Sequence, residues 1–298
     1  MIGIYVGESF AEIAAKNNLN GEISFNRWFL PQLSIEKGIE KFLIENNFNE
    51  VSEVRWMTRF GRQVIHKGLG HNPALLVTEG FESWPFMNLP IDQIHFSAFP
   101  EKQKPPIQSH LIFGISERVN SKGEIDKKLD TEELEFLVSK LQLNKIEHVA
   151  IGLLHSNLNP SHEKLIEEYL KERGFKVFPS YKFNTSSSEK PRWWSSVLNA
   201  YLEPSFNSLK KSIQNGFESQ NINCEIKIHH SSDIYNDIDG QPLNSLFGPS
   251  ELFSSISQDE SKAILYFGIE EFLLIPAFNK NQKYWNAPFG RVAINHRP

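Results

Sequence analysis

His155 and Ser156 are neighbouring side chains of types that take part in acid-base and nucleophilic catalysis. They follow the apolar run 148–154, at the end of an expected strand, where open α/β sheets bind their ligands. A histidine next to a serine is not a catalytic dyad by itself, because the fold must also supply an orienting carboxylate. We therefore expect both side chains to cap the turn.

Three other groups could bind a metal or act as a nucleophile. The stretch 229–233 holds two histidines and an aspartate, but neighbours on a strand point to opposite faces, so a bidentate metal site is not expected. The single cysteine, Cys224, lies among polar residues without a nearby partner, which argues against a catalytic thiol. His162 and Glu163 fall in the first turn of an expected helix, where we interpret them as ordinary helix-start residues favoured by the helix dipole.

The composition limits the partners that this chain could have. Its 298 residues are 40% hydrophobic and 12% aromatic, enough to build a full core. The net charge of −5 leaves no broad basic face for a phosphate backbone, so nucleic acid is an unexpected partner. The start of the chain lacks a secretory signal, and no apolar run approaches the ~20 residues of a membrane helix. With one cysteine and no disulfide, we expect a soluble, cytoplasmic protein.

The N-terminal third of the chain alternates between strands and helices. The run 1–6 predicts a strand, and the alternating segment 22–30 is expected to be its antiparallel partner. Ser34 predicts the start of a helix with an apolar face. Buried strands are predicted at 54–57 and 74–77.

The clearest unit lies at 147–180. Before it, Asp130 followed by Glu133 has the spacing of a capping box at the start of a helix. The continuous apolar run 148–154 predicts a strand buried on both faces. A helix is expected after Asn159 as its cap, with a packing face of Leu165, Ile166, Tyr169 and Leu170. A strand follows, so the unit is β-α-β and predicts an α/β fold.

Further helices and strands are predicted after the β-α-β unit. The polar loop 184–190 is followed by a helix that Pro204 should break or end, with a second helical stretch to about residue 215. Trp193 and Trp194 are adjacent at the start of this helix. Core packing is the default expectation for both, and the alternative is that one is exposed as an interface anchor. Further strands are predicted at 225–229 and 263–267.

Two segments near opposite ends of the chain are similar to each other. Residues 4–10 (IYVGESF) and 265–272 (LYFGIEEF) both read as a strand, a glycine, acidic or small residues and a phenylalanine. The pattern favours two related strand–turn hairpins, as in a duplicated ribonuclease-H-like half, although two short strands can also match by chance.

Five stretches, taken in order, resemble the N-terminal half of the hydantoinase A and 5-oxoprolinase family, within the actin-like ATPase superfamily. They are IGIYVGESFAEI (2–13), ALLVTEGFES (74–83), SHLIFGISERVNSKGEI with LDTEELEFLVSKL (109–141), AIGLLHSNLNPSHEKLIEEYL (150–170) and RWWSSVLNAYLEP (192–204). The resemblance covers roughly 1–275. It implies hydrolysis of cyclic amides such as hydantoins or 5-oxoproline coupled to ATP cleavage, or a subunit of an ATP-dependent carboxylase.

In this family two strand–turn–strand hairpins grip the nucleotide phosphates and Mg²⁺. Glycine N–H groups approach the phosphates, hydroxyls donate further hydrogen bonds, and aspartates hold the metal or its waters. The resemblance therefore carries remnant nucleotide-binding positions over to Gly7, Ser9, Glu12, Thr58 and Gly268. An acid such as Glu12 at a strand end is more often a solvated charge than a metal ligand.

The sequence departs from the family where the chemistry lies. The leading aspartate of each hairpin is a tyrosine here, Tyr5 and Tyr266, and Glu8 replaces the second glycine of the first hairpin. The H-G-T-T loop of the family reads WMTR at 56–59. Since the family continues past the second hairpin and this chain stops at Pro298, we also expect a cleft open on one side.

We therefore predict an α/β fold, ribonuclease-H-like and actin-like, whose mixed sheet has helices on both faces and a short C-terminal β segment. Residues 1–262 would form the hydantoinase/oxoprolinase N-terminal-like domain, and 263–298 a remnant of the second-lobe hairpin. The favoured function is a catalytically degenerate member that acts by binding, as a homo-oligomer or beside a catalytic relative, with neither nucleic acid nor membrane as a partner.

Two alternatives stay open. The chain could be an active amidase or carboxylase subunit completed by a partner chain, or a small-ligand binder with Tyr5 and Tyr266 lining the old cleft and His155 as a further pocket candidate. No cofactor is expected, and ATP with Mg²⁺ only if the degenerate cleft still binds them.

Overall fold

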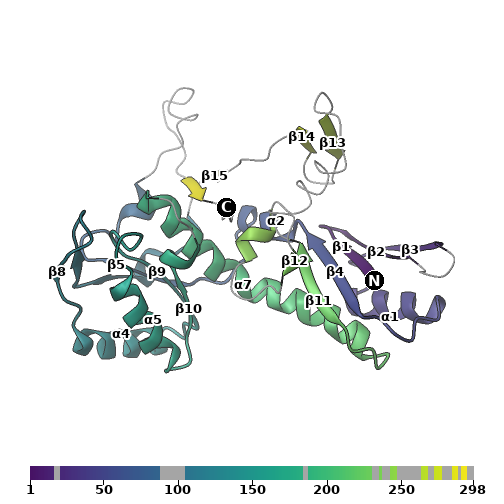
Figure 1. Cartoon of the computed structure of the whole chain (residues 1–298), viewed down its shortest axis with the longest axis horizontal. Coiled ribbons are helices and arrows are strands. Elements are labelled where there is room, and N and C mark those ends of the chain that lie inside the picture. The colour runs from purple at the N-terminus through teal and green to yellow at the C-terminus, as the bar shows by residue number, and fades with distance from the viewer. Residues whose placement is uncertain are drawn as a thin grey trace. The chain divides into compact units, whose positions relative to one another are not determined.

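The computed structural model describes residues 1–16, 21–87, 105–183, 187–229, 235–236, 242–246, 263–267, 272–276, 284–287 and 290–293. The chain divides into two compact units. Unit 1 consists of Met1–Leu69, Pro204–Asn281 and His296–Pro298, and unit 2 of Gly70–Glu203 and Gln282–Asn295. Figure 1 labels most of the helices and strands of both.

Unit 1 contains a six-stranded mixed sheet with the order β12-β11-β4-β1-β2-β3. The strands are β1 (Ile2–Val6), β2 (Phe10–Lys16), β3 (Ile23–Phe29), β4 (Glu53–Thr58), β11 (Glu225–His229) and β12 (Tyr235–Asn236). β4 runs parallel to both β1 and β11, whereas β2 runs antiparallel to β1 and β3. The predicted pairing of 1–6 with 22–30 is therefore wrong. The missed strand β2 is rich in alanine, which is depleted in strands, and it lies between them.

Helix α1 (Ile35–Glu45) begins where the sequence predicts. The Ser34 hydroxyl accepts a hydrogen bond from Lys37 N at 3.3 Å, and Ile39, Phe42 and Leu43 are buried. The helix packs closely on the sheet, because a Cβ on Gly38 would lie 2.2 Å from Trp28. The short helix α2 (Phe60–His66) follows β4.

Helix α7 (Glu189–Glu218) is a single 30-residue helix that contains Pro204, so the predicted break at this proline is wrong. Buried side chains before and after Pro204 in the sequence, including Leu202 and Phe206, stabilise the helix. Tertiary packing outweighs the hydrogen bond that proline removes. Trp193 and Trp194 are both buried, 1% and 0% exposed, so the core packing expected by default is confirmed.

Unit 2 contains a four-stranded parallel sheet with the order β10-β9-β5-β6. Its strands are β5 (Ala74–Thr78), β6 (Ile112–Ile115), β9 (His148–Gly152) and β10 (Lys176–Pro179), and helices α4 (Thr131–Leu143) and α5 (Ser161–Lys171) accompany them. The predicted β-α-β unit at 147–180 is confirmed. A core of buried apolar side chains lies between these two helices and the sheet. On the other face, a Cβ on Gly152 would lie 2.5 Å from Trp193 of α7.

Three details of the two helices differ from the expectations. The Glu133 carboxylate accepts a hydrogen bond from Ser116 N at 3.1 Å, so the long-range contact takes the place of the capping box. The cap of α5 is Pro160, and Asn159 instead accepts a hydrogen bond from Ser161 N at 3.1 Å. Leu165 is 53% exposed, because the helix turns Ile166 and Leu170 toward the core.

The remaining described elements are short. They are the 3-10 helices Trp84–Phe86, Ser109–Leu111 and Pro242–Ser245, helix α6 (Ser180–Phe183), and strands β7 (Arg118–Val119), β8 (Ile125–Lys127), β13 (Ala263–Phe267), β14 (Phe272–Pro276), β15 (Tyr284–Ala287) and β16 (Gly290–Ala293). β13 and β14 form an antiparallel hairpin, so the predicted strand at 263–267 is confirmed. Residues 184–186 of the predicted loop 184–190 lie outside the described residues, and Glu189 and Lys190 already belong to α7, so the loop prediction is wrong at these two positions. Within the described part, no helix has the length and apolar character needed to cross a membrane.

Candidate functional site

The turn between β1 and β2 holds Gly7, Glu8 and Ser9. Gly7 N donates a hydrogen bond to Phe10 O at 2.9 Å and closes the turn. A Cβ on Gly7 would lie 3.1 Å from Phe10 O and 3.2 Å from the Tyr5 ring. Glycine is thus favoured here by close packing within the hairpin itself, whether or not a phosphate binds.

Thr58 ends β4, beside the end of β1, since Val6 and Thr58 are register partners. Its side chain is buried, and its hydroxyl donates to Val6 O at 2.7 Å and accepts from Phe60 N at 3.0 Å. The hydroxyl proton is therefore bonded to the end of β1, and the hydroxyl oxygen accepts from the start of α2. It is not directed at a ligand.

Glu12 lies on β2 in a row of register partners that runs across three strands. Tyr5 faces Glu12, and Glu12 faces Arg27. The Arg27 Nε atom is 3.3 Å from Glu12 Oε1, in a pair that is partly exposed to solvent. Glu12 thus has a counter-charge within the protein. The structure brings Tyr5, Gly7 and Glu12 onto one hairpin, as the sequence predicts.

The other predicted positions are not joined to this hairpin. Tyr266 pairs through its backbone with Leu273 in the β13–β14 hairpin, and its side chain and Gly268 lie outside what the structure describes. His155 belongs to unit 2, where it follows β9 in a left-handed conformation with φ of 53°. Its carbonyl accepts hydrogen bonds from Leu158 N and Asn159 N at 2.9 and 3.0 Å, so the main chain closes the turn.

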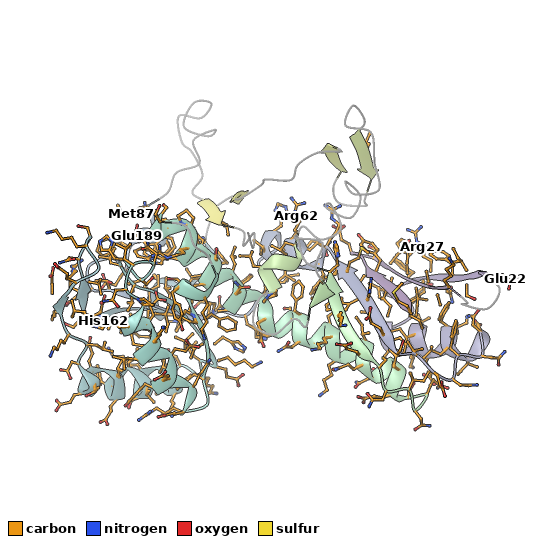
Figure 2. The ribbon with its side chains drawn as sticks, in the orientation of Figure 1. Glu22, Arg27, Arg62, Met87, His162 and Glu189 are labelled. Carbon is orange, nitrogen blue, oxygen red and sulfur yellow. The ribbon has the colours of Figure 1, made fainter. Side chains whose placement is uncertain are left out.

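A second group of polar side chains lies where the parallel strands of unit 2 end. The Thr78 hydroxyl, after β5, donates to the Glu117 carboxylate and accepts from Leu154 N at 3.0 Å. The His162 Nδ1 atom is 2.7 Å from the other oxygen of Glu117. Thr78, Glu117 and His162 are at most 3% exposed, so this chain of hydrogen bonds is part of the interior. Figure 2 labels His162 among the side chains of this unit.

Glu163 lies next to this chain of hydrogen bonds and is fully buried. Its carboxylate accepts hydrogen bonds from Leu153 N at 2.9 Å, the Ser180 hydroxyl at 2.7 Å and Tyr181 N at 3.1 Å. Burial raises the pKa of Glu163, and these hydrogen bonds oppose the shift only in part. The interpretation of His162 and Glu163 as ordinary helix-start residues is therefore wrong, because α5 directs both side chains into the interior.

Ser156 and Arg192 extend this network. The Ser156 hydroxyl is 3.1 Å from that of Ser180, and Arg192 Nη2 donates to Ser156 at 3.3 Å. Burial lowers the pKa of Arg192, and the charges of Glu163 and Glu189 oppose this shift. Ser156 is thus committed to the interior and is not presented as a nucleophile.

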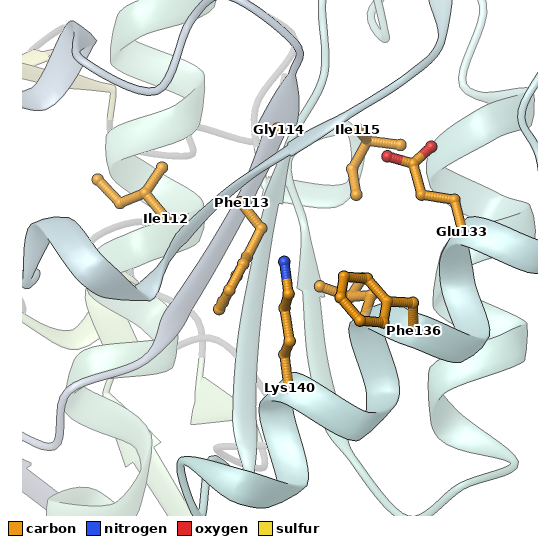
Figure 3. Close-up of a pocket in the computed structure, with 8 residues that line it drawn as sticks. Ile112, Phe113, Gly114, Ile115, Glu133, Phe136 and Lys140 are labelled. Carbon is orange, nitrogen blue, oxygen red and sulfur yellow. The ribbon is translucent and has the colours of Figure 1, made fainter.

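One small pocket lies between the edge strand β6 and helix α4, with a volume of about 210 Å³ (Figure 3). Phe113, Ile115, Phe136 and Leu137 form most of its lining, and Glu133 and Lys140 add charge. Figure 3 shows the Lys140 side chain directed between the two phenylalanines, and its Nζ atom lies 4.3 Å from the Phe136 ring centroid. The lining of this pocket contains none of the predicted site residues and no serine, threonine, cysteine or histidine.

The described residues offer little further chemistry. They contain no group of three or more His, Cys, Asp or Glu side chains placed to hold a metal ion. Burial, with a smaller effect of Glu218, raises the pKa of Cys224 to about 11, which makes its thiol a poor nucleophile at neutral pH. The sequence reading missed the unit 2 network, although one signal was present. Glu117, His162, Glu163 and Arg192 all lie in the stretches that retain the family pattern.

Comparison with known proteins gives a consistent result. The profile of the hydantoinase/oxoprolinase N-terminal region matches residues 29–174. The chain is 26% identical over 240 residues to an uncharacterized protein of Methanocaldococcus jannaschii, covering 78% of this chain and 35% of that protein. It is 28% identical over 181 residues to the acetophenone carboxylase gamma subunit of Aromatoleum aromaticum, covering 58% of this chain and 24% of the subunit.

The fold is also similar to a solved structure. The ATP-dependent caprolactamase from Pseudomonas jessenii is 17% identical and superimposes with a TM-score of 0.79, covering 98% of this chain and 46% of that one. This chain therefore spans less than half the length of each of these three proteins. The likeness extends over nearly the whole of the fold and agrees with the predicted α/β class.

Proposed function

Because this chain carries the N-terminal region of the hydantoinase/oxoprolinase family, we propose that it is a member of the family that has lost ATP chemistry and acts by binding. The observation that supports this most is the β1–β2 hairpin. There the family's metal-associated aspartate is Tyr5, and Glu8 occupies a turn position that the family keeps as glycine.

The electrostatics of the hairpin oppose a bound polyphosphate. A tyrosine supplies no charge to Mg²⁺. The Glu8 carboxylate would add a negative charge beside the phosphates, and two like charges at about 4 Å repel by roughly 1–4 kcal/mol depending on the effective dielectric. Glu12 is paired with Arg27, and the Thr58 proton is bonded to Val6 O. Both side chains thus already have partners on neighbouring strands.

Isothermal titration calorimetry of the purified chain with ATP, with and without Mg²⁺, tests this proposal. We expect no heat of binding for the natural chain at millimolar ATP. A matched variant that restores the family residues, Tyr5→Asp with Glu8→Gly and Tyr266→Asp, should gain Mg²⁺-dependent binding if the rest of the cleft is retained. Tight, Mg²⁺-dependent binding by the natural chain, or an ATPase rate that Glu12→Ala abolishes, would overturn the proposal.

The second candidate is an active amidase or carboxylase subunit that a partner chain completes. It is favoured by the similarity to the acetophenone carboxylase gamma subunit, which is by name one subunit of an assembly. In this case the missing phosphate and metal ligands would come from the other chain. ATP turnover that appears only on mixing with the partner would support it, and a lack of turnover with every co-purifying chain would count against it.

A further inference from the structure

Strand β3 is an edge of the unit 1 sheet, and among the described residues only β2 pairs with it. Three of its apolar side chains are exposed, Ile23 at 69%, Phe25 at 60% and Phe29 at 36%. Figure 2 labels Arg27 on this strand and Glu22 directly before it. Proteins usually protect a sheet edge with charge, proline or a covering element, because an open apolar edge pairs with another strand.

Among the described residues, the backbone groups of β3 that have no partner strand belong to the same residues as its exposed side chains. Leu30 N donates to Ser9 O at 2.7 Å, which makes Ser9 and Leu30 a hydrogen-bonded pair in the register that joins Phe10 to Phe29. Such pairs alternate along an antiparallel ladder. The even-numbered residues of β3 therefore bond to β2. The odd-numbered residues Ile23, Phe25, Arg27 and Phe29 direct their N–H and C=O groups away from it.

We propose that β3 pairs antiparallel with β3 of a second copy of this chain, about a two-fold axis at Asn26. Ile23 then faces Phe29 of the second copy, and Phe25 faces Arg27 of the second copy. Each of these residues has its free backbone groups at the edge, so the ladder can form along the whole strand. The two sheets become one continuous sheet, which removes both open edges.

The side chains of β3 are complementary to themselves in this register. An aliphatic side chain meets an aromatic one, and a guanidinium meets an aromatic ring, pairs that stabilise neighbouring strands. The charge of Arg27 is already balanced by Glu12 of its own chain. This self-complementarity is what an isologous two-fold interface requires, so the second copy is the partner that fits.

Other registers fit less well. If the second copy were shifted by one residue, the outward-directed N–H and C=O groups of one strand would lie opposite residues of the other strand that already bond to β2. The exposed side chains of the two copies would then lie on opposite faces of the joined sheet. Moving the axis to Arg27 would place this arginine opposite its own copy, and like charges in that position are destabilising. Moving it to Phe25 would leave Phe29 opposite Gly21. Only the axis at Asn26 uses the full strand.

Cysteine crosslinking tests the register directly. Asn26 faces its own copy in a non-hydrogen-bonded pair, where the Cα atoms are about 4.5 Å apart, a separation that a disulfide spans. In a Cys224→Ser background, Asn26→Cys should form a covalent dimer with oxidised glutathione. The glutathione disulfide is reduced to two thiols as the two cysteines join. Ser24→Cys is the matched control, because it faces Trp28 of the second copy and should remain monomeric.

Charge substitutions test the same pairing without a covalent bond. Phe25→Lys places a like charge opposite Arg27 of the second copy at two positions, so sedimentation equilibrium should show dimerisation at least about tenfold weaker than in the natural chain. Phe25→Glu places an opposite charge there and should keep the dimer. Leu143→Lys, at a side chain 84% exposed in unit 2, is the control and should leave the dimer unchanged.

Two results would overturn the pairing. One is a natural chain that stays monomeric at about 100 µM, a concentration at which a dimer with a dissociation constant of about 100 µM would hold about half of the chains. The other is equal loss of the dimer in Phe25→Lys and Phe25→Glu, which would show association through apolar contact without this register. Neither result depends on ATP, so the inference and the proposed function can fail separately.

Discussion

Glu163 is a buried acceptor for three donors of unit 2, Leu153 N, the Ser180 hydroxyl and Tyr181 N. Glu163→Ala would leave these donors buried without an acceptor, at about 1–3 kcal/mol for each one that water cannot reach. We expect the free energy of unfolding to fall by roughly 2–5 kcal/mol, measured by urea denaturation. Glu168→Ala, at an exposed position of the same helix, is the control. A loss no larger than the control's would contradict the role of this carboxylate.

Glu203 gives a prediction about pH. Burial would raise its pKa, but hydrogen bonds from His148 and Lys176 outweigh this effect, so the pKa lies below its ordinary value. The unfolded chain therefore binds more protons in the window between the two pKa values. The carboxylate stabilises the fold above the unfolded value of about 4.3, and this contribution is lost as pH falls through the folded pKa.

Glu203→Gln should therefore be less stable than the natural chain at pH 7. The difference should shrink as pH falls from the unfolded value of about 4.3 through the lowered folded pKa, because the natural carboxyl then becomes protonated too. Urea denaturation of both proteins across this range measures the difference. Exposed Glu168→Gln should show no such trend. A difference between Glu203→Gln and the natural chain that does not change with pH would contradict the assignment.

Residue types alone indicated part of the candidate site. From the resemblance to the family, the sequence predicts a change in chemistry at Tyr5 and Glu8, and this stays a prediction. The partner of the Thr58 hydroxyl could not be predicted, because it is a carbonyl 52 residues away on a neighbouring strand. For the same reason the burial of Glu163 was missed. It depends on Ser180 and Tyr181, which a later strand brings beside the start of α5.

At the level of elements, the contact between α1 and β3 at Gly38 is, with that at Gly61, the tightest among the described glycines of unit 1. A Cβ on Gly38 would lie 2.2 Å from the buried Trp28 ring. Gly38→Ala should therefore cost about 1–3 kcal/mol through overpacking, even though alanine favours the helix by about 1 kcal/mol. Gly3→Ala is the control, since its nearest neighbour would lie at 3.9 Å.

A double variant separates overpacking from a general loss of helix. Adding Trp28→Phe makes room beside residue 38, so the double variant should lose less stability than the sum of the two single variants. Chemical denaturation of all four proteins gives this coupling. Full additivity would show that the clash does not account for the cost of Gly38→Ala.

Local pattern predicted the elements that carry a strong signal. Ser34 and the apolar face that follows it predicted helix α1, and the continuous apolar run predicted strand β9. The local pattern failed at β2, where alanines weaken the strand signal. It also failed at Pro204, where burial of the side chains before and after the proline outweighs its low helix propensity. Both failures come from packing between elements, which neighbouring letters do not encode.

The whole molecule has two compact units, each with its own sheet and buried side chains. We therefore expect differential scanning calorimetry to resolve two transitions. Gly38→Ala should lower the Tm of one transition, and Glu163→Ala that of the other. A single transition lowered by both substitutions would contradict independent unfolding.

The α/β class was predicted from the alternation of helices and strands along the sequence, but the sequence did not predict which strands belong to which sheet. Sheet membership depends on pairings such as that of β4 with β11, far apart along the chain.

The pairing of β4 with β11 has a consequence for the growing polypeptide. Every strand of the unit 2 sheet lies within residues 74–179, whereas the unit 1 sheet joins residues 2–58 to residues 225–229. On the ribosome, where folding proceeds as residues emerge, the middle of the chain can complete its sheet first. The strands of residues 2–58 are synthesised first, and β4 lacks its neighbouring strand until β11 has been made. This delay, set by the order of synthesis, makes β4 the strand most in need of protection in the nascent protein.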